Sequence, residues 1–258
     1  MAYFMHMKAV ILAGGRGTRL SEETHVKPKP LVEASGHPLI WHVMQNYALH
    51  GITEFVVLAG YKGQQLKEYF ANYWLHQSDI TFDLSTPSHE IVEVRNLPWK
   101  VTVLDTGVDS NTGSRILRLK SLIDESFLLT YGDGVADVDI SSLVDCHKNS
   151  RNLVTLTAVK PPARFGALNL VNGQIVNFQE KPQGEGAWVN GGFFVVDPLI
   201  FNYLNGVNPS FEMDVLPKIA NEGKLGAYKH EGFWQPVDTI RDLQRLEEAI
   251  KRKALPWT

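Results

Sequence analysis

The stretch Lys8-Ala-Val-Ile-Leu-Ala-Gly-Gly-Arg-Gly-Thr-Arg-Leu20 decides the fold of this chain. Residues 8–13 form a short apolar run that ends in glycines, a pattern typical of a strand buried on both faces of a parallel sheet. The glycines let backbone N–H groups approach an anion without interference from a Cβ. In an open α/β sheet such a loop lies in the crevice beyond the carboxyl end of the strand, where ligands bind. The sequence therefore predicts a phosphate-binding loop after the first strand.

Two well-known phosphate motifs do not match this loop. A dinucleotide-binding fingerprint needs a glycine where Leu20 stands, and a Walker loop needs Gly-Lys-Ser/Thr where Gly17-Thr18-Arg19 stands. The dehydrogenase and P-loop ATPase interpretations are both weakened.

Three cations near the loop favour a polyphosphate ligand. Arginine grips two phosphate oxygens at once, whereas lysine acts as a mobile point charge. The cations are Arg16, Arg19 and Lys29. The alternative is that Gly14, Gly15 and Gly17 only make a turn.

The first half of the chain alternates strand and helix patterns. Apolar runs bounded by turn residues predict strands at 53–59, 101–105 and 127–131. Helical spacing and end signals predict helices at 38–50, 62–76 and 115–123. This alternation is typical of βαβ units and a parallel sheet.

The second half of the chain changes character after residue 153. Two alternating stretches, 167–171 and 174–179, meet at Asn172-Gly173, which predicts a hairpin and makes the sheet mixed. We further expect a strand at 192–196 and helices at 198–204, 212–222 and 239–253. Segment 84–98, with two prolines and mixed polarity, carries no clear pattern.

Composition restricts the class of protein. The 258 residues carry 25 basic and 28 acidic side chains, a formal net charge of −3, with 44% hydrophobic residues. These values describe a soluble globular protein and speak against nucleic acid or an anionic membrane as a partner. The apolar run before Gly14 is too short for a signal peptide or a membrane span. The single cysteine, Cys146, fits a reducing compartment, so we expect a cytoplasmic protein.

An ordered series of motifs resembles the sugar-1-phosphate nucleotidylyltransferase family along nearly the whole chain from Met7. The series begins with the glycine loop and Lys27-Pro-Lys-Pro30 and continues with Tyr131-Gly-Asp-Gly134, Arg164-Phe-Gly166, Glu180-Lys-Pro182, Asn190-Gly-Gly192 and Phe233-Trp-Gln-Pro-Val-Asp238. Ser21-Glu-Glu-Thr24 looks most like the branch that uses CTP and glucose 1-phosphate.

The resemblance implies an α/β, Rossmann-like nucleotidyltransferase fold, with a mixed central sheet flanked by helices and a small hairpin-containing part that binds sugar. We expect an N-terminal extension at 1–6 and a single domain at 7–258. Within it the nucleotide-binding part covers about 7–150 and the sugar-phosphate-binding part about 151–258.

The resemblance also implies a set of site residues. The nucleotide-binding set is Leu12, Ala13, Gly14, Gly15, Arg16, Gly17, Thr18, Arg19, Lys29, Thr112, Arg115 and Gly132. The sugar-phosphate-binding set is Gly166, Glu180, Lys181, Asn190 and Gly191. The catalytic set is Arg19, Lys29, Asp133 and Lys181, and the magnesium ligands are Asp133 and Asp238.

Several of these residues also have a plain structural explanation. Gly132-Asp133-Gly134 and Asn190-Gly191-Gly192 are compatible with simple turns, and Glu180-Lys181 with an exposed strand end. Thr112 fits the N-cap region of a helix as well as a base-reading role beside Arg115.

The activity implied by the resemblance is transfer of a cytidylyl group from CTP to glucose 1-phosphate, with Mg²⁺ as cofactor. The alternatives are uridylyl or thymidylyl transfer to another hexose 1-phosphate, and a non-catalytic nucleotide-sugar sensor. Relatives commonly form homo-oligomers, for which segment 84–98 or the last helix is a candidate interface. A solvated face explains the last helix equally well.

Overall fold

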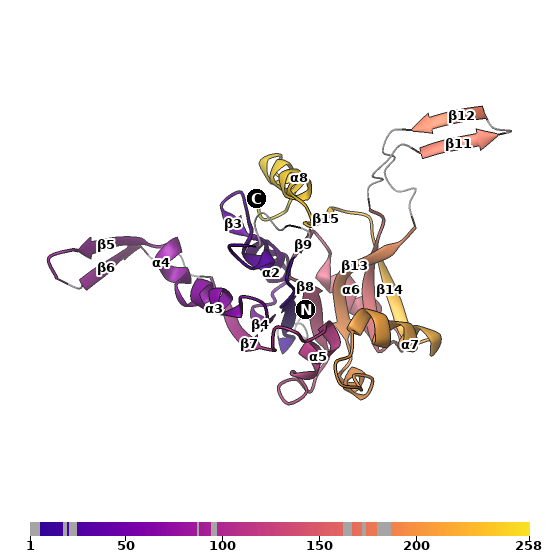
Figure 1. Ribbon diagram of the computed structural model, residues 1–258, viewed down its shortest axis with the longest axis horizontal. Helices are drawn as coiled ribbons and strands as arrows, with labels where there is room; N and C mark the ends of the chain where they lie inside the picture. Colours follow the sequence, from indigo (N-terminus) through magenta and orange to yellow (C-terminus); the bar gives the residue numbers. More distant parts are fainter. Residues whose placement is uncertain are drawn as a thin grey trace.

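The computed structural model describes residues 6–17, 20, 25–86, 88–93, 97–161, 167–171, 174–179 and 187–258. Its centre is a seven-stranded sheet in the order β14-β10-β13-β8-β1-β4-β7 (Figure 1). The strands are β1 (Ala9–Ala13), β4 (Glu54–Ala59), β7 (Lys100–Asp105), β8 (Phe127–Tyr131), β10 (Val154–Val159), β13 (Val189–Val196) and β14 (Leu225–His230).

The sheet is mixed, as predicted. Strand β13 runs antiparallel to both of its neighbours, β8 and β10, whereas the remaining neighbours pair in parallel. Strand β1 lies between β8 and β4 and is buried along its whole length. The loop after β1 therefore opens at the carboxyl edge of the parallel part of the sheet, where such sheets bind ligands.

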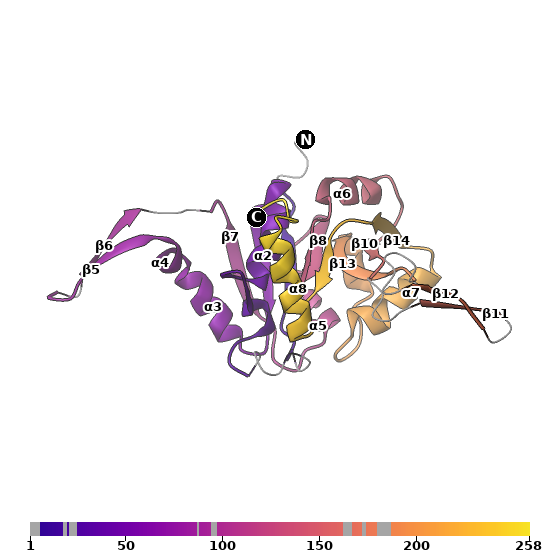
Figure 2. The same ribbon diagram turned by 90° about the horizontal axis from the view of Figure 1, so that it is seen from above.

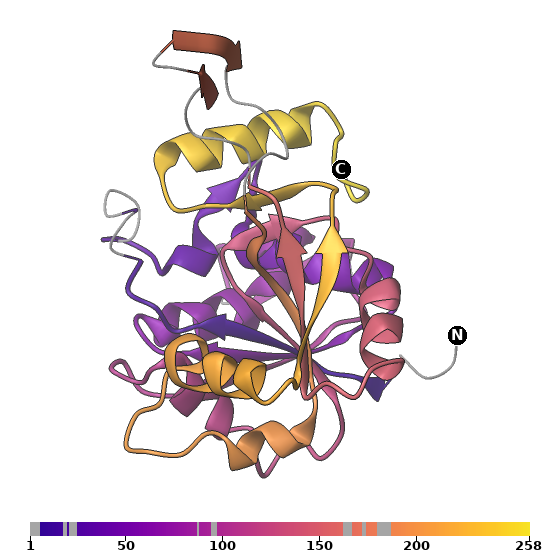
Figure 3. The same cartoon turned by 90° about the vertical axis from the view of Figure 1, so that its right-hand side faces the viewer.

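Helices cover both faces of the sheet and create two apolar clusters. The helices are α2 (Leu39–Leu49), α3 (Gly63–Ala71), α4 (Tyr73–Gln77), α5 (Thr112–Leu117), α6 (Ile140–Lys148), α7 (Leu216–Asn221) and α8 (Ile240–Lys251). Ile11 packs into one cluster, with residues of α2, α6 and α8, while Val10 and Leu12 pack into the other, with residues of α5 and α7. Figure 3 shows the strands between α8, in yellow, on one side and α7, in orange, on the other.

Several helix predictions need correction. The helix expected at 62–76 is divided at Asn72 into α3 and α4. The helix expected at 115–123 is α5, which begins at Thr112 and ends at Leu117. The segment 198–204 holds only a 3-10 turn, Pro198–Asn202, and 212–222 holds a π-helical turn, Phe211–Val215, followed by α7.

The hairpin and the long helices were predicted well. The antiparallel pair β11 (Ala167–Val171) and β12 (Gln174–Gln179) has the predicted bounds, and α2 matches the helix expected at 38–50. Three further short pairs were not predicted: β2 (Glu33–Ala34) with β3 (His37–Pro38), β9 (Gly134–Ala136) with β15 (Trp234–Pro236), and β5 (Asp79–Asp83) with β6 (Ser88–Glu93).

A two-stranded arm extends beyond the helices at the far end of the molecule (Figures 1 and 2). Its strands are β5 (Asp79–Asp83) and β6 (Ser88–Glu93), and they follow α3 and α4. We call residues 79–93 the arm; they include much of the segment whose sequence carried no clear pattern. Among the described residues, no helix is long and apolar enough to cross a membrane.

Candidate active site

A cleft of about 210 Å³ opens at the carboxyl ends of β1 and β8. Most of its lining belongs to the predicted nucleotide and metal sites: Leu12, Ala13, Gly15, Gly17, Lys29, Gly132, Asp133 and Asp238, together with Pro30. The structure therefore brings together residues from four separate stretches of the chain.

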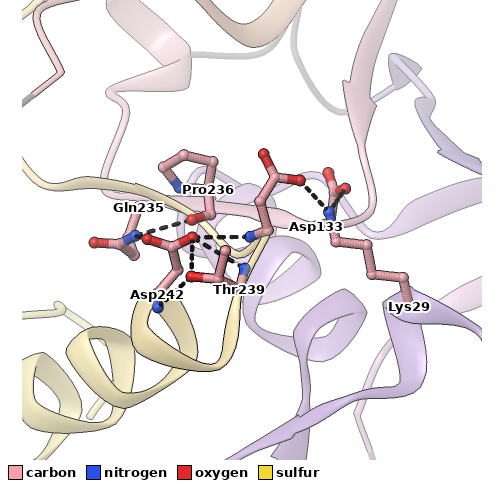
Figure 4. Close-up of polar contacts among 7 residues, drawn as sticks. Lys29, Asp133, Gln235, Pro236, Thr239 and Asp242 are labelled. Atoms are coloured by element: carbon pink, nitrogen blue, oxygen red, sulfur yellow. Dashed lines mark hydrogen bonds and ion pairs between the residues drawn. The ribbon is translucent and has the colours of Figure 1, made fainter. Parts of the chain in front are cut away.

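Lys29 connects the two predicted metal ligands. Its Nζ donates to Asp133 Oδ2 at 2.6 Å and to Asp238 Oδ1 at 2.7 Å. Figure 4 shows the lysine side chain reaching the carboxylate of Asp133. Burial alone lowers the pKa of Lys29, but the two carboxylates outweigh burial, so its pKa lies above the ordinary value. Lys29 is therefore fully charged at neutral pH.

The β9–β15 pair explains how residues 133 and 238 meet. Asp133 directly precedes β9, and Asp238 follows Pro236, the last residue of β15. Pro236 pairs with Gly134, and the backbone N–H of Val237 donates to the carbonyl of Asp133 at 3.0 Å. This antiparallel pairing brings two carboxylates that are far apart in the sequence to one side of the cleft.

Asp242 supports the loop that carries Asp238. Its Oδ2 accepts from the backbone N–H of Asp238 at 3.3 Å and from the hydroxyl of Thr239 at 2.8 Å, and its Oδ1 accepts from Gln235 (Figure 4). Thr239 and Asp242 form a capping box at the start of α8. We did not predict this role, although the spacing Thr239-x-x-Asp242 is a recognisable signal for it.

The donor set of the cleft fits a magnesium ion. Magnesium prefers oxygen ligands and is usually held by one or two carboxylates together with substrate phosphates. Asp133 and Asp238 are two carboxylates that already share one cation, the ammonium of Lys29. In the described part of the chain, no group of three or more His, Cys, Asp or Glu side chains comes together as a complete metal site. Phosphate oxygens and water would have to supply the missing ligands.

The structure places Arg115 differently from the sequence prediction. Its side chain is buried, and its guanidinium donates to the carbonyls of Gly14 and Gly107 and to the hydroxyl of Thr106. A Cβ at Gly14 would collide with this guanidinium. The absence of a Cβ at Gly14 therefore makes room for the guanidinium, which hydrogen-bonds the loop backbone. Because the guanidinium is buried in these contacts, its position does not support base recognition by Arg115.

Two other loop residues have distinct surroundings. Among the described residues, no atom lies within 4 Å of the position of a Cβ at Gly15, which lines the open cleft. Arg16 forms an ion pair with Asp109 at 2.7 Å, and both side chains are largely exposed. Such a pair contributes little to stability.

Thr112, Tyr131 and Asn190 belong to one hydrogen-bond network centred on Glu212. The hydroxyls of Thr112 and Tyr131 donate to the two carboxylate oxygens of Glu212 at 2.5 and 2.8 Å, and Asn190 donates to the Tyr131 hydroxyl at 3.3 Å. Burial and the nearby carboxylate raise the pKa of Tyr131, which keeps its hydroxyl protonated. Asn111, not Thr112, occupies the N-cap of α5.

Glu212 was not among the predicted site residues. It lies in the π-helical turn Phe211–Val215, a rare geometry that is frequent at functional sites. Its network joins Thr112, which we predicted to be on the nucleotide side, with Asn190, which we predicted to be on the sugar side. Sequence spacing offers no signal for a contact between residues 112 and 212.

The remaining predicted residues divide into two groups. Gly191 is buried, and its carbonyl accepts from the Trp234 indole N–H at 2.8 Å. Thr18, Arg19, Gly166, Glu180 and Lys181 lie outside the described residues, so their predicted roles stay predictions.

Comparison with known proteins finds relatives that match nearly the whole chain. The family model described as nucleotidyl transferase matches residues 8–253. The glucose-1-phosphate cytidylyltransferase of Salmonella typhi is 51% identical over 253 residues, which cover 97% of this chain and 98% of that protein. The Bacillus subtilis protein named probable glucose-1-phosphate cytidylyltransferase is 43% identical and covers 97% and 99% of the two chains.

A solved structure shows the same fold. HddC from Yersinia pseudotuberculosis superposes with a TM-score of 0.68 at 22% identity, over 95% of this chain and 99% of that one. The mixed sheet, the cleft at its carboxyl edge and the match over residues 8–253 lead to one conclusion. This chain belongs to the nucleotidyl transferase family.

Proposed function

We propose that this protein transfers the cytidylyl group of CTP to glucose 1-phosphate, giving CDP-glucose and pyrophosphate. The observation that carries the proposal is the convergence of Lys29, Asp133 and Asp238 in the cleft after β1. The choice of substrates is supported by 51% and 43% identity over nearly full length to proteins named for this reaction.

In the proposed reaction, an oxygen of glucose 1-phosphate attacks the α-phosphorus of CTP in line. The bond from the α-phosphorus to the bridging oxygen breaks, and pyrophosphate leaves with that oxygen. The second pKa of a phosphate monoester is about 6, so the attacking phosphate is largely dianionic at neutral pH and needs no general base. The protein has to align two anions and neutralise their charge.

The residues of the cleft are suited to that task. Gly15 leaves the loop backbone open to the triphosphate, Gly17 lines the same cleft, and Lys29 supplies a mobile positive charge there. Asp133 and Asp238 would hold Mg²⁺, which screens the two anions from each other and stabilises the leaving pyrophosphate. From the family resemblance we also propose that Arg19 binds the triphosphate, that Lys181 binds the sugar phosphate and that Gly166 and Glu180 contact the hexose.

We infer further that the enzyme works in the cytoplasm as a homo-oligomer and that its product serves surface-polysaccharide synthesis such as O-antigen. The arm supports the assembly proposal. A lone two-stranded hairpin is marginally stable in water, and Phe82, Leu84 and Val92 expose most of their apolar surface on it. A second copy of the chain is the proposed partner of the arm.

The test is a measurement of pyrophosphate release with Mg²⁺ and glucose 1-phosphate, in which CTP, UTP, dTTP, ATP and GTP are compared side by side. We expect strong preference for CTP and recovery of CTP from CDP-glucose and pyrophosphate. Preference for UTP or dTTP would keep the mechanism and change the base. Binding of a nucleotide without any turnover would favour a nucleotide-sugar sensor.

A further inference from the structure

Lys29 occupies the place between the two carboxylates where a shared cation binds. Its Nζ lies 2.6 Å from Asp133 Oδ2 and 2.7 Å from Asp238 Oδ1, and 10% of its side chain is exposed. These distances are those of charge-assisted hydrogen bonds, the strongest that a lysine makes. The ammonium is therefore held in place from two sides.

An ammonium and a magnesium ion cannot both bind these oxygens in that arrangement. Magnesium needs near-octahedral oxygen ligands at about 2.0–2.1 Å. An ion at that distance from Asp133 Oδ2 and Asp238 Oδ1 would displace the ammonium from its hydrogen bonds, and the two cations would repel each other at close range. A metal ion that bridges these two oxygens thus requires Lys29 to move away.

The same cleft offers the lysine a second partner once a polyphosphate enters. Lys29 lines the cleft together with Gly15 and Gly17 of the loop after β1. Phosphate oxygens placed against that loop would accept hydrogen bonds from the ammonium and neutralise its charge. The lysine can then leave the carboxylates without remaining as an unpaired charge in the cleft.

We propose that Lys29 blocks the metal site of the free protein and that the metal ion and the nucleotide triphosphate enter together. The carboxylate pair is then a weak metal site on its own and a strong one when a polyphosphate draws the lysine away. The inference rests on the proposed function only in taking the polyphosphate to be a nucleoside triphosphate.

A neighbouring lysine supplies a matched control. Lys27 lies two residues earlier and pairs with Glu33 at 2.9 Å, which is outside the lining of the cleft. Replacing Lys27 removes the same charge from the same segment and leaves the carboxylate pair blocked. A change caused only by net charge would therefore appear in both variants.

The test is a titration of the nucleotide-free protein with Mn²⁺. Binding is measured by calorimetry and by electron paramagnetic resonance of the free ion. We expect Lys29→Met to bind Mn²⁺ at least tenfold more tightly than the parent protein, and Lys27→Met to bind it as the parent does. Adding Asp133→Asn to Lys29→Met should abolish the gain, which locates the ion at the carboxylate pair.

Equal Mn²⁺ affinity of the parent and Lys29→Met would overturn the proposal, and so would an equal gain in Lys27→Met. Near-UV circular dichroism checks the fold of each variant. If Lys29→Met does not fold, Lys29→Gln is judged by the same criteria, because glutamine is also neutral.

The titration contains neither nucleotide nor sugar phosphate. A tenfold gain in the Mn²⁺ affinity of Lys29→Met, together with no cytidylyl transfer by the parent protein, would reject the proposed function and keep this inference. Cytidylyl transfer by the parent protein, without any gain in the Mn²⁺ affinity of Lys29→Met, would keep the function and reject the inference.

Discussion

The cleft and the arm are built in opposite ways. In the cleft, the contacts of Lys29 with Asp133 and Asp238 join residues 104 and 209 positions apart in the chain. In the arm, Asp83 forms the turn by accepting hydrogen bonds from Ser85 and Thr86, two and three positions away. The cleft depends on the whole sheet, whereas the arm depends on its own turn and ladder.

This difference indicates which property each region controls. The residues of the cleft are held by strands and loops that meet at one sheet edge, so changing one side chain there leaves its supports in place. The described residues of the two arm strands are largely exposed and form no core of their own. We therefore expect changes in the cleft to affect chemistry and changes in the arm to affect assembly.

The largest expected effect comes from the cleft. Lys29→Ala or Asp133→Asn should reduce turnover about 1000-fold, because each removes a charged group placed against the reacting phosphates. Thermal unfolding should show that both variants fold. Lys27→Ala, whose partner is the exposed Glu33, should keep turnover within about twofold of the parent. Near-normal turnover of Lys29→Ala or Asp133→Asn would remove that residue from the proposed mechanism.

Acid should lower the stability of the fold through a histidine buried in the core. His42, on α2, is buried beside Ala34 and Trp257, and burial lowers its pKa to about 4. In the unfolded chain its pKa is about 6.5, so unfolding takes up a proton between these values and stability falls as pH drops. The shift in the pKa of His42 lowers the free energy of unfolding by about 3 kcal/mol at pH 4 and below, compared with neutral pH.

Urea unfolding at pH values from 7 to 4 measures this loss. The variant His42→Gln, whose side chain does not titrate, should show a flatter dependence of the free energy of unfolding on pH. An unchanged slope in that variant would assign the acid sensitivity to other groups, such as His50 and His147, whose pKa values burial also lowers.

A smaller effect is expected at the network between the two halves of the site. Glu212→Gln weakens the hydrogen bonds from Thr112 and Tyr131, because it replaces a charged acceptor by a neutral one. We expect kcat/KM for glucose 1-phosphate to fall about tenfold, mainly through KM. Glu222→Gln, which alters an exposed contact with Tyr203 and Lys224, is the matched control. Equal kinetics of both variants would exclude Glu212 from the site.

The smallest effect on turnover is expected from the arm. Leu84 is 96% exposed, and Leu84→Lys should shift the protein towards smaller assemblies while the turnover of each chain changes less than about twofold. Light scattering after size-exclusion chromatography measures the assembly. Val207→Lys, at another fully exposed apolar residue outside the arm, should leave the assembly unchanged. An unchanged mass of Leu84→Lys would exclude Leu84 from the interface.

Local patterns in the sequence predicted the local structure well. The apolar run before Gly14 is β1, and the stretches 167–171 and 174–179 are the two strands of the predicted hairpin. Lys29 was predicted as a cation near the glycine loop, and family resemblance placed Asp133 among the metal ligands; both line the cleft. The segment 62–76 was less successful, since its apolar spacing continues through Asn72, where the helix breaks.

Contacts across the chain could not be predicted from spacing. Asp238 was paired with Asp133 through family resemblance, and the β9–β15 ladder that joins them is too short to give a strand pattern. Arginine is a residue type that commonly binds anionic ligands. Only the folded structure shows that the guanidinium of Arg115 is buried against backbone carbonyls. Glu212 was missed for the same reason.

The buried guanidinium of Arg115 has an evolutionary consequence. A Cβ at Gly14 or at Gly60 would collide with it, although the three positions are far apart in the sequence. A larger residue at either glycine becomes tolerable only after the arginine is replaced, and loss of the arginine leaves an unfilled space beside both glycines. Positions 14, 60 and 115 should therefore vary together among relatives, as a group that changes in a fixed order.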